Sequence, residues 1–348
     1  MQINVRDQSA TESTRLPQGR VSSIAVLGAG VAGLSAARVL QAAGHRVLVF
    51  DKGRRAAGRI STRRSERFAF DHGAQYFTAR DPRFVAEVET WLEQRFVAPW
   101  QGRIVSLGFE GDRTPVGPDT VRYVGVPGMS ALAGYLASDL EVESGAEITS
   151  MQRVSGGWRL RGEREDFGAY DKVLITLPAP QAATLLDVAP RLQERVQAVR
   201  FRPTWAVLLG LAERYDVDFD GAFVADSPLA WIARNSSKPG RPDTEAWVLH
   251  AAPAWSHAYQ ASDPGRVFDR LTRELVERTG VELPEVAHGT SRFWRYALPD
   301  PPLETGPAAD PELGLAVAGD WTHGARIEGA FLSGLEAASE LTAEPVLR

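Results

Sequence analysis

The sequence predicts an α/β fold in which a Rossmann-like domain is interrupted by an inserted α+β domain. The first observation is a strand–turn–helix–strand pattern over residues 23–51, near the start of the chain. The second is a buried strand at 313–318, followed by a helix rich in small residues. The third is mixed strand and helix patterning between these ends, in a chain of 348 residues that exceeds one domain of about 100–200 residues.

The first βαβ pattern is complete. Residues 23–27 form a short apolar run with β-branched side chains, which predicts a buried parallel strand. A helical pattern follows over 31–43 and ends at Gly44, a residue typical of helix C-termini. A second strand over 46–50 ends at Asp51.

The remaining elements are read from the same periodicities. The basic, glycine-interrupted segment 54–67 predicts a loop, and three short runs separated by polar turns predict a β-meander. The predicted helices are 82–96, 129–140, 264–279 and 327–341, and the predicted strands lie at 104–124, 147–154, 157–161, 166–169, 172–177, 204–212, 246–251 and 313–318.

Strands of the dinucleotide-binding type at both ends of the chain favour a discontinuous cofactor domain over two sequential domains. The expected division is a disordered leader at 1–21, a cofactor domain from 22–80, 125–200 and 297–345, and a substrate domain from 81–124 and 201–296.

Composition limits the classes of function. The net charge of −5 disfavours nucleic acid, and no run of eighteen apolar residues predicts a membrane span. The polar first twenty residues lack the apolar core of a signal peptide, so we expect a cytoplasmic protein. The absence of cysteine excludes disulfides, thiol nucleophiles and cysteinyl flavin attachment, and the six histidines show no metal-ligand spacing. No segment predicts a protein partner.

The glycine-rich turn after the first strand predicts a dinucleotide site. Gly28 allows a tight turn, Gly30 lets the backbone approach a pyrophosphate, and Gly33 allows close helix–strand packing. The N–H groups of Val31 and Ala32 stand at the helix N-terminus, where they favour an anion. Asp51 follows Gly33 by 18 residues and would accept hydrogen bonds from a ribose. A chance glycine-rich turn is the alternative, which this context disfavours.

Two further features choose FAD over NAD. Gly58-Arg59 offers close backbone approach and a positive charge for a pyrophosphate, although a solvated basic loop explains it equally well. Near the other end, the strand 315–318 closes on Gly319-Asp320, whose carboxylate would accept from ribityl hydroxyls that NAD lacks. The last helix, from Ile327 through Gly329-Ala330, would point its N-terminus at the flavin.

These motifs resemble the FAD-dependent amine oxidase superfamily with its p-hydroxybenzoate hydroxylase-like fold. The resemblance rests on residues 24–51, 58–63 and 319–320 and covers roughly residues 22–342. Within the superfamily, residues 71–77 (Asp-His-Gly-Ala-Gln-Tyr-Phe) and the short chain resemble renalase and its bacterial relatives.

The resemblance implies FAD held without a covalent bond, with Lys52, Gln75 and Tyr76 beside it. The chain departs from the superfamily in having Ala57 before Gly58-Arg59, where a second glycine is common, and Asp51, where glutamate is common. Both departures leave backbone approach and ribose acceptance intact.

The lysines bear on the reaction. Amine oxidation in the superfamily commonly employs a lysine near the flavin, and none of Lys52, Lys172 and Lys238 is well placed for it in the sequence. The renalase resemblance instead implies oxidation of misplaced-hydride isomers of NAD(P)H, the 2-dihydro or 6-dihydro forms, to NAD(P)⁺, with O₂ reduced to H₂O₂. A dihydropyridine loses only a hydride on becoming aromatic, so positioning replaces a general base.

Candidate residues around the substrate follow from the same resemblance. They are Tyr76, Asn235, His250, Trp294 and Tyr296. Core packing explains Tyr76 and Trp294 equally well, a turn role explains Asn235, and structural hydrogen bonding explains His250. Arg295 and Arg234 are candidates for the substrate phosphates or for a solvated surface, while His72 and His323 flank the cofactor motifs.

Three alternatives remain beside the dihydronicotinamide oxidase. A small amine oxidase or desaturase would use the same cofactor motifs. A non-catalytic flavin-binding redox sensor would bind FAD without turnover, and an NAD-dependent dehydrogenase would be colourless.

Overall fold

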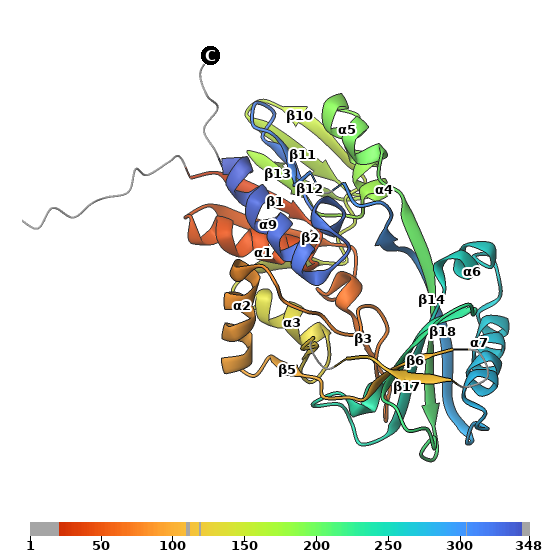
Figure 1. Cartoon of the computed structure of the whole chain (residues 1–348). Helices are drawn as coiled ribbons and strands as arrows, with labels where there is room; N and C mark the ends of the chain where they lie inside the picture. Colours follow the sequence, from red (N-terminus) through yellow and green to blue (C-terminus); the bar gives the residue numbers. More distant parts are fainter. Residues whose placement is uncertain (1–20, 109–111, 118–119, 304, 343–348) are drawn as a thin grey trace, which may run out of the picture.

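The computed structural model describes residues 21–108, 112–117, 120–303 and 305–342. Apart from Val21, the leader expected at 1–21 lies outside these residues. Figure 1 shows one sheet at each end of the molecule, with the long strand β14 (Phe201–Leu211) running from one to the other.

The first sheet has six strands and the order of a Rossmann-like domain. Neighbouring strands are parallel except for the edge pair β19–β20. In spatial order the strands are β19 (Ala308–Asp310), β20 (Leu315–Val317), β13 (Lys172–Ile175), β1 (Ser23–Leu27), β2 (Arg46–Asp51) and β9 (Glu141–Ser144).

Both faces of this sheet are covered by other elements. Because successive side chains of a strand point to opposite sides, alternate residues of β1 pack against different layers. Ile24 and Val26 pack toward α1 (Val31–Ala42) and α9 (Ile327–Thr342), while Ala25 and Leu27 pack toward a three-stranded meander. The meander consists of β10 (Ser150–Val154), β11 (Gly157–Arg161) and β12 (Asp166–Tyr170), and α4 (Ala179–Ala182), η3 (Ala183–Leu185) and α5 (Pro190–Gln197) complete this layer.

The second sheet has seven strands and is mostly antiparallel. In spatial order they are β18 (Val286–Pro299), β14, β17 (Glu245–Ala251), β16 (Leu229–Arg234), β15 (Gly221–Val224), β6 (Ile104–Leu107) and β7 (Arg113–Pro115). One face packs on α7 (Pro264–Thr279), with α6 (Pro253–Ala258) against β14. The sequence delimits α7 well, because Asp263 caps its first N–H groups and Gly280 ends it at φ +69°.

The opposite face of the seven-stranded sheet is covered by a hairpin of β3 (Thr62–Arg64) and β4 (Ala69–Asp71). Phe68 and Phe70 of this hairpin pack against Ala206, Leu208 and Val248. The hairpin follows η1 (Gly58–Ile60) and therefore carries the chain from the cofactor motifs to the second sheet.

The remaining elements belong to neither of the two large sheets. They are α2 (Pro82–Glu93), β5 (Val97–Pro99), β8 (Tyr123–Gly125), α3 (Ser130–Leu136), η4 (Asn235–Ser237) and α8 (Asp320–His323). α2 packs on α9 through Phe84 and Phe331, whose ring centroids are 5.2 Å apart. We therefore propose the two-domain division with one change: α2 is grouped with the six-stranded sheet rather than with the substrate domain.

The structure confirms the predicted α/β fold class, the meander, and the helices at 264–279 and 327–341. The prediction of a loop over 54–67 is wrong, since η1 and β3 form there. The short strand β3 is stabilised by pairing with β4, and the basic sequence of residues 54–67 does not predict this pairing. No helix within the described ranges is long and apolar enough to cross a bilayer.

Candidate active site

The glycine-rich turn has the geometry that the sequence requires. Gly28 has φ +112° and donates from its N–H to the carbonyl of Phe50 at 2.8 Å. A methyl group at Gly33 would lie 1.9 Å from the carbonyl oxygen of Gly28, so the helix can pack here only with glycine. At Gly30 an added Cβ would meet no atom of the described residues within 4 Å.

The open space at Gly30 is bounded by a second glycine. A Cβ at Gly58 would lie 3.4 Å from the Cα of Gly30, so the turn after β1 and the turn after β2 face each other. Both Asp51 carboxylate oxygens accept backbone hydrogen bonds at 2.7 Å, from Ala29 and Gly53. Two side-chain-free backbones beside a helix N-terminus form a cradle that fits a pyrophosphate.

Two predicted cofactor residues from opposite ends of the chain meet directly. The guanidinium of Arg59 binds both carboxylate oxygens of Asp320, at 2.6 and 2.8 Å, and donates to the carbonyl of Ala297 at 3.1 Å. Asp320 is buried and Arg59 is partly exposed. The pair leaves lone pairs on Asp320 and N–H groups on Arg59 for a ligand.

Three other predicted cofactor residues, Ile327, Gly329 and Ala330, lie in the first turn of α9. Ile327 begins α9, and Ala330 in its first turn donates from its N–H to Arg326. An added Cβ at Gly329 would lie 2.3 Å from the carbonyl oxygen of Gly324. Lys52 points elsewhere: its exposed ammonium pairs with Glu147 at 3.3 Å.

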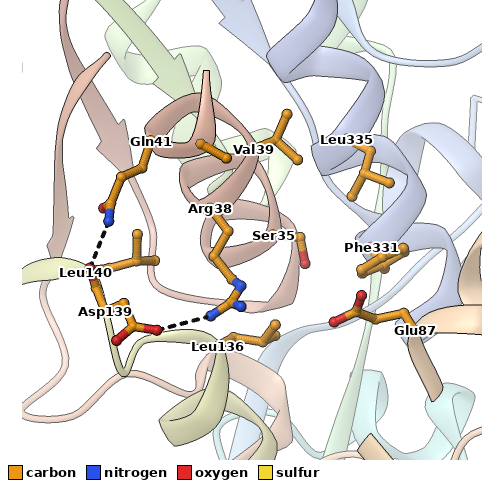
Figure 2. Close-up of a pocket in the computed structure, with 11 residues that line it drawn as sticks. Ser35, Arg38, Val39, Gln41, Glu87, Leu136, Asp139, Leu140, Phe331 and Leu335 are labelled. Carbon is orange, nitrogen blue, oxygen red and sulfur yellow. Dashed lines mark hydrogen bonds and ion pairs between the residues drawn. The ribbon is translucent and has the colours of Figure 1, made fainter. Parts of the chain in front are cut away.

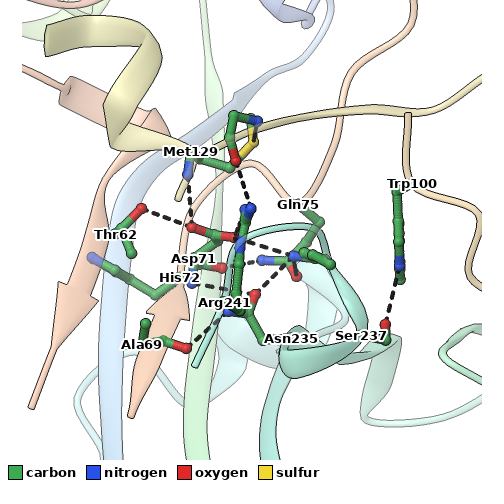
Figure 3. Close-up of polar contacts among 12 residues, drawn as sticks. Thr62, Ala69, Asp71, His72, Gln75, Trp100, Met129, Asn235, Ser237 and Arg241 are labelled. Carbon is green, nitrogen blue, oxygen red and sulfur yellow. Dashed lines mark hydrogen bonds and ion pairs between the residues drawn. The ribbon is translucent and has the colours of Figure 1, made fainter. Parts of the chain in front are cut away.

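A fully buried ion cluster lies between the hairpin β3–β4 and η4 (Figure 3). Asp71 pairs with Arg241 and, at 3.5 Å, with Lys238, and all three side chains have no exposed surface. Asp71 also accepts from Thr62 and from the N–H of Met129. Burial alone would raise the pKa of Asp71, but the two cations and these donors hold it below its ordinary value.

Lys238 is the centre of this cluster. Its ammonium donates to Asn235 at 2.8 Å and to Gln75 at 3.1 Å, beside the ion pair with Asp71. Burial lowers the pKa of Lys238 to about 7. The three acceptors match the three N–H groups of an ammonium, so the side chain is bound on all sides.

The expectation that no lysine is well placed near the site is therefore wrong for Lys238. It lies in a Ser-Ser-Lys-Pro-Gly segment that looks like a surface loop, yet η4 turns it inward onto residues more than 160 positions away in the sequence. Lys172 fits the expectation, since its ammonium donates to the carbonyl of Leu341 on α9.

Two of the predicted substrate residues, Trp294 and His250, contact the carbonyl oxygen of His72. Trp294 donates to this oxygen from Nε1 at 2.9 Å, and His250 contacts it through Nε2 at 3.2 Å. The His72 and Trp294 rings are stacked, with centroids 5.0 Å apart and an interplanar angle of 22°. Asn235 is close in sequence to the ion cluster and donates to the carbonyl of Ala69 at 2.8 Å.

Both histidines are neutral at pH 7. Burial is the largest cause and lowers the pKa of each, His72 and His250, to about 4. Neutral His250 in the tautomer with hydrogen on Nε2 donates to the His72 carbonyl, which leaves its Nδ1 as an acceptor. Within the part of the chain that the structure describes, His72 Nδ1 is buried without a hydrogen-bond partner.

Tyr76 belongs to a neighbouring aromatic group. Its ring lies 5.5 Å from Trp231 and 6.3 Å from Trp100, measured between centroids. Trp100 donates to Ser237 in η4, which links the aromatic group to the ion cluster. Gln75 holds the same segment by donating to the carbonyls of Asp71 and Gly73.

Tyr296 is not brought together with Trp294 and His250. Its ring packs edge-on against Phe201 at 5.8 Å, and with Arg295 it lines a cavity of about 490 Å³ between α5, α6 and β18. Arg234, the other candidate for substrate phosphates, is buried and bound to Glu245 and to two backbone carbonyls. Its predicted role at phosphates or in solvent is wrong, because β16 turns it into the protein interior.

Sequence reasoning missed Asp71, Arg241, Trp100 and Trp231 as site residues. Asp71 is the first residue of the segment 71–77 that carries the renalase resemblance, so this segment could have identified it as a site residue. Arg241 and the tryptophans carry no local signal.

A second cavity, of about 450 Å³, lies between α1, α2, α3 and α9 and is lined by Arg38 and Asp139, which form an ion pair (Figure 2). In the described part of the chain no three His, Asp or Glu side chains are grouped as metal ligands.

Comparison with known proteins identifies the class. The family described as flavin containing amine oxidoreductase matches residues 98–342, and a NAD(P)-binding Rossmann-like domain matches residues 26–88. The chain belongs to the flavin-containing amine oxidoreductase family. This membership confirms the predicted superfamily and its cofactor, FAD, and makes the chain an FAD-dependent oxidoreductase.

Solved structures show the same fold at low sequence identity. A provisionally assigned protoporphyrinogen oxidase from an Exiguobacterium species superposes with a TM-score of 0.73 at 14% identity, over 92% of this chain and 98% of that one. Putrescine oxidase gives 0.72 at 14% identity, over 93% and 100%. Cyclohexylamine oxidase from Brevibacterium oxydans gives 0.72 at 11% identity, over 93% and 99%.

One curated relative matches locally. The chain is 50% identical over 50 residues to the 4,4'-diapophytoene desaturase (4,4'-diaponeurosporene-forming) of Staphylococcus haemolyticus. The match spans 14% of this chain and 10% of that protein.

Proposed function

We propose that this FAD-dependent oxidoreductase is a renalase-like oxidase of misplaced-hydride isomers of NAD(P)H. The 2-dihydro or 6-dihydro form would lose a hydride and leave as NAD(P)⁺. When bound, FAD would supply the acceptor for that hydride and the route of the electron pair to O₂, which with one proton gives H₂O₂. The balance is one dihydronicotinamide, one O₂ and one proton to one NAD(P)⁺ and one H₂O₂.

The observation that carries the proposal is the state of the titratable groups. His72 and His250 have pKa values of about 4, so both are weak bases at pH 7. Lys238 has a pKa of about 7, so about half of it is a neutral amine at pH 7, but its Nζ is enclosed by Asp71, Gln75 and Asn235 and is not open to a substrate proton. A dihydropyridine needs no base, because its ring nitrogen drives hydride loss. A site without an accessible base is therefore suited to oxidation of a dihydropyridine.

The remaining contribution of the protein is positioning. The stacked His72–Trp294 rings, fixed on one carbonyl oxygen, supply a flat wall against which a nicotinamide ring can stack. His250 Nδ1 is an acceptor for the carboxamide N–H, and Tyr76 closes the site with Trp231. Reaction then depends on holding the donor carbon at about 3–3.5 Å from its acceptor.

The cofactor would be held by residues from both ends of the chain. The Gly30–Gly58 cradle and Arg59 would bind the pyrophosphate, Asp51 the adenosine ribose, and Asp320 the ribityl hydroxyls. The absence of cysteine leaves non-covalent binding as the expected mode.

An anaerobic titration tests the proposal. Purified 2-dihydro and 6-dihydro isomers of NAD(P)H are added in turn to the yellow protein, and a primary amine is added to a parallel sample. We expect at least one isomer to bleach the flavin stoichiometrically, with NAD(P)⁺ as product and colour restored by air. An oxidised flavin with every isomer, together with bleaching by the amine, would assign the chain to amine oxidation.

A further inference from the structure

The edge strand β18 presents one row of side chains to the candidate active site. Register with β14 pairs Ala206 with Arg292 and Thr204 with Trp294. Residues two apart share a face of a strand, so Arg292 lies on the same face as Trp294 and next to it. Ala206 on this face packs in the cluster with Phe68 and Phe70, so it is the face toward the β3–β4 hairpin.

A second arginine reaches the same place from the hairpin. Arg63 is paired directly with Phe70, so the two side chains project to the same side of the hairpin. Phe70 stacks on His288 of β18, with ring centroids 5.4 Å apart, so this side faces β18. His72 follows β4 immediately and stacks on Trp294.

Arg63 and Arg292 are both exposed. In the described ranges neither the Arg63 side chain nor the Arg292 side chain forms an ion pair or a hydrogen bond. Both are close enough to His72 to contribute to the lowering of its pKa. Two unpaired cations beside a stacked aromatic wall, in a chain with a net charge of −5, indicate a local site for an anion.

We propose that Arg63 and Arg292 bind the pyrophosphate of a dinucleotide substrate whose reacting ring lies against Trp294. The planar guanidinium binds phosphate oxygens through paired N–H groups, which suits this ligand. The assignment rests on the proposed function, since a phosphate-free amine would have no use for the pair. Arg295 lines the cavity beside Tyr296 instead.

Binding of NAD⁺ to the oxidised holoprotein tests the subsite without turnover. Calorimetry at low salt compares wild type with Arg63→Gln, Arg292→Gln, the double variant, Arg295→Gln, and Arg270→Gln on α7 as the matched control. We expect NAD⁺ affinity to fall roughly tenfold for each of Arg63 and Arg292, and to stay unchanged in the control. Undiminished affinity in the double variant, loss confined to Arg295→Gln, or no NAD⁺ binding by wild type would overturn the subsite.

Kinetics separate the subsite from a merely structural effect and from the proposed function. The double variant should lose kcat/KM for a 2-dihydro dinucleotide but keep it for the phosphate-free N-methyl 2-dihydronicotinamide. Equal loss for both substrates would mean that the arginines support the fold of the site, and would overturn the subsite. If wild type oxidises neither substrate, the proposed function fails, and NAD⁺ binding alone decides the subsite.

Discussion

Replacement of the buried lysine by an apolar side chain of similar length is predicted to change how stability depends on pH. Burial holds the pKa of Lys238 at about 7 in the folded protein, against about 10.4 in an unfolded chain. Between these values the unfolded chain binds more protons, so the free energy of unfolding rises with pH. The linkage relation gives a rise of about 2 kcal/mol between pH 7 and pH 9 from this one group.

Urea unfolding with saturating FAD measures the effect in wild type, Lys238→Met and Lys52→Met. Lys52 is a matched control because its ammonium is exposed and pairs only at the surface. We expect the rise between pH 7 and pH 9 to disappear in Lys238→Met and to persist in Lys52→Met. Identical pH dependence in all three proteins would refute the assignment of a depressed lysine pKa at the centre of the site.

Three further predictions concern the cofactor cradle and the histidines. Gly30→Ala should weaken FAD binding at least tenfold, as measured by fluorescence titration, while the stability of the apoprotein is kept. Gly33→Ala should destabilise the fold itself in urea unfolding, because its methyl group would lie 1.9 Å from a carbonyl oxygen. Between pH 6.5 and pH 4 the unfolded His250 binds a proton that the folded one does not, so the free energy of unfolding falls with falling pH by at most about 1.4 kcal/mol per pH unit from this group. His250→Gln should remove this contribution. A urea midpoint that depends on pH in the same way as in wild type would contradict this. Flavin bleaching by the preferred isomer should be retained in Lys238→Met and have a constant rate in that variant from about pH 6 to pH 9, because no base takes part. Loss of bleaching in the variant, or a sigmoidal stopped-flow profile in that range, would argue for a catalytic base.

The cofactor half of the protein follows from local sequence patterns. The turn at Gly28–Gly33 needs glycine for reasons of backbone geometry and packing, and the central parallel strands β1, β13 and β20 are short apolar runs. The meander and α7 are delimited by turn and capping residues that act over a few positions. Such signals are read without knowledge of the tertiary fold.

The structure of the substrate half depends on tertiary contacts that local sequence patterns do not predict. β18 carries polar and glycine residues among its apolar ones, and it is a strand because β14 pairs with it along its length. Lys238 looks exposed in the sequence, and only its contacts with Gln75 and Asp71, far away in the chain, make it a buried group. Asn235 and His250 remain predictions as substrate residues, although the fold brings both to the neighbourhood of residues 69–75.

Single-turnover reduction with a deuterated substrate tests the central claim most directly. A 2-dihydro isomer of NAD carrying deuterium at ring carbon 2 is mixed anaerobically with the holoprotein, and flavin bleaching is followed by stopped flow. Direct hydride transfer predicts slower bleaching with the deuterated ring, no comparable slowing in D₂O, and NAD⁺ in a one-to-one ratio with reduced flavin. A flavin that stays oxidised, or that bleaches at a rate indifferent to ring deuterium, would contradict the account.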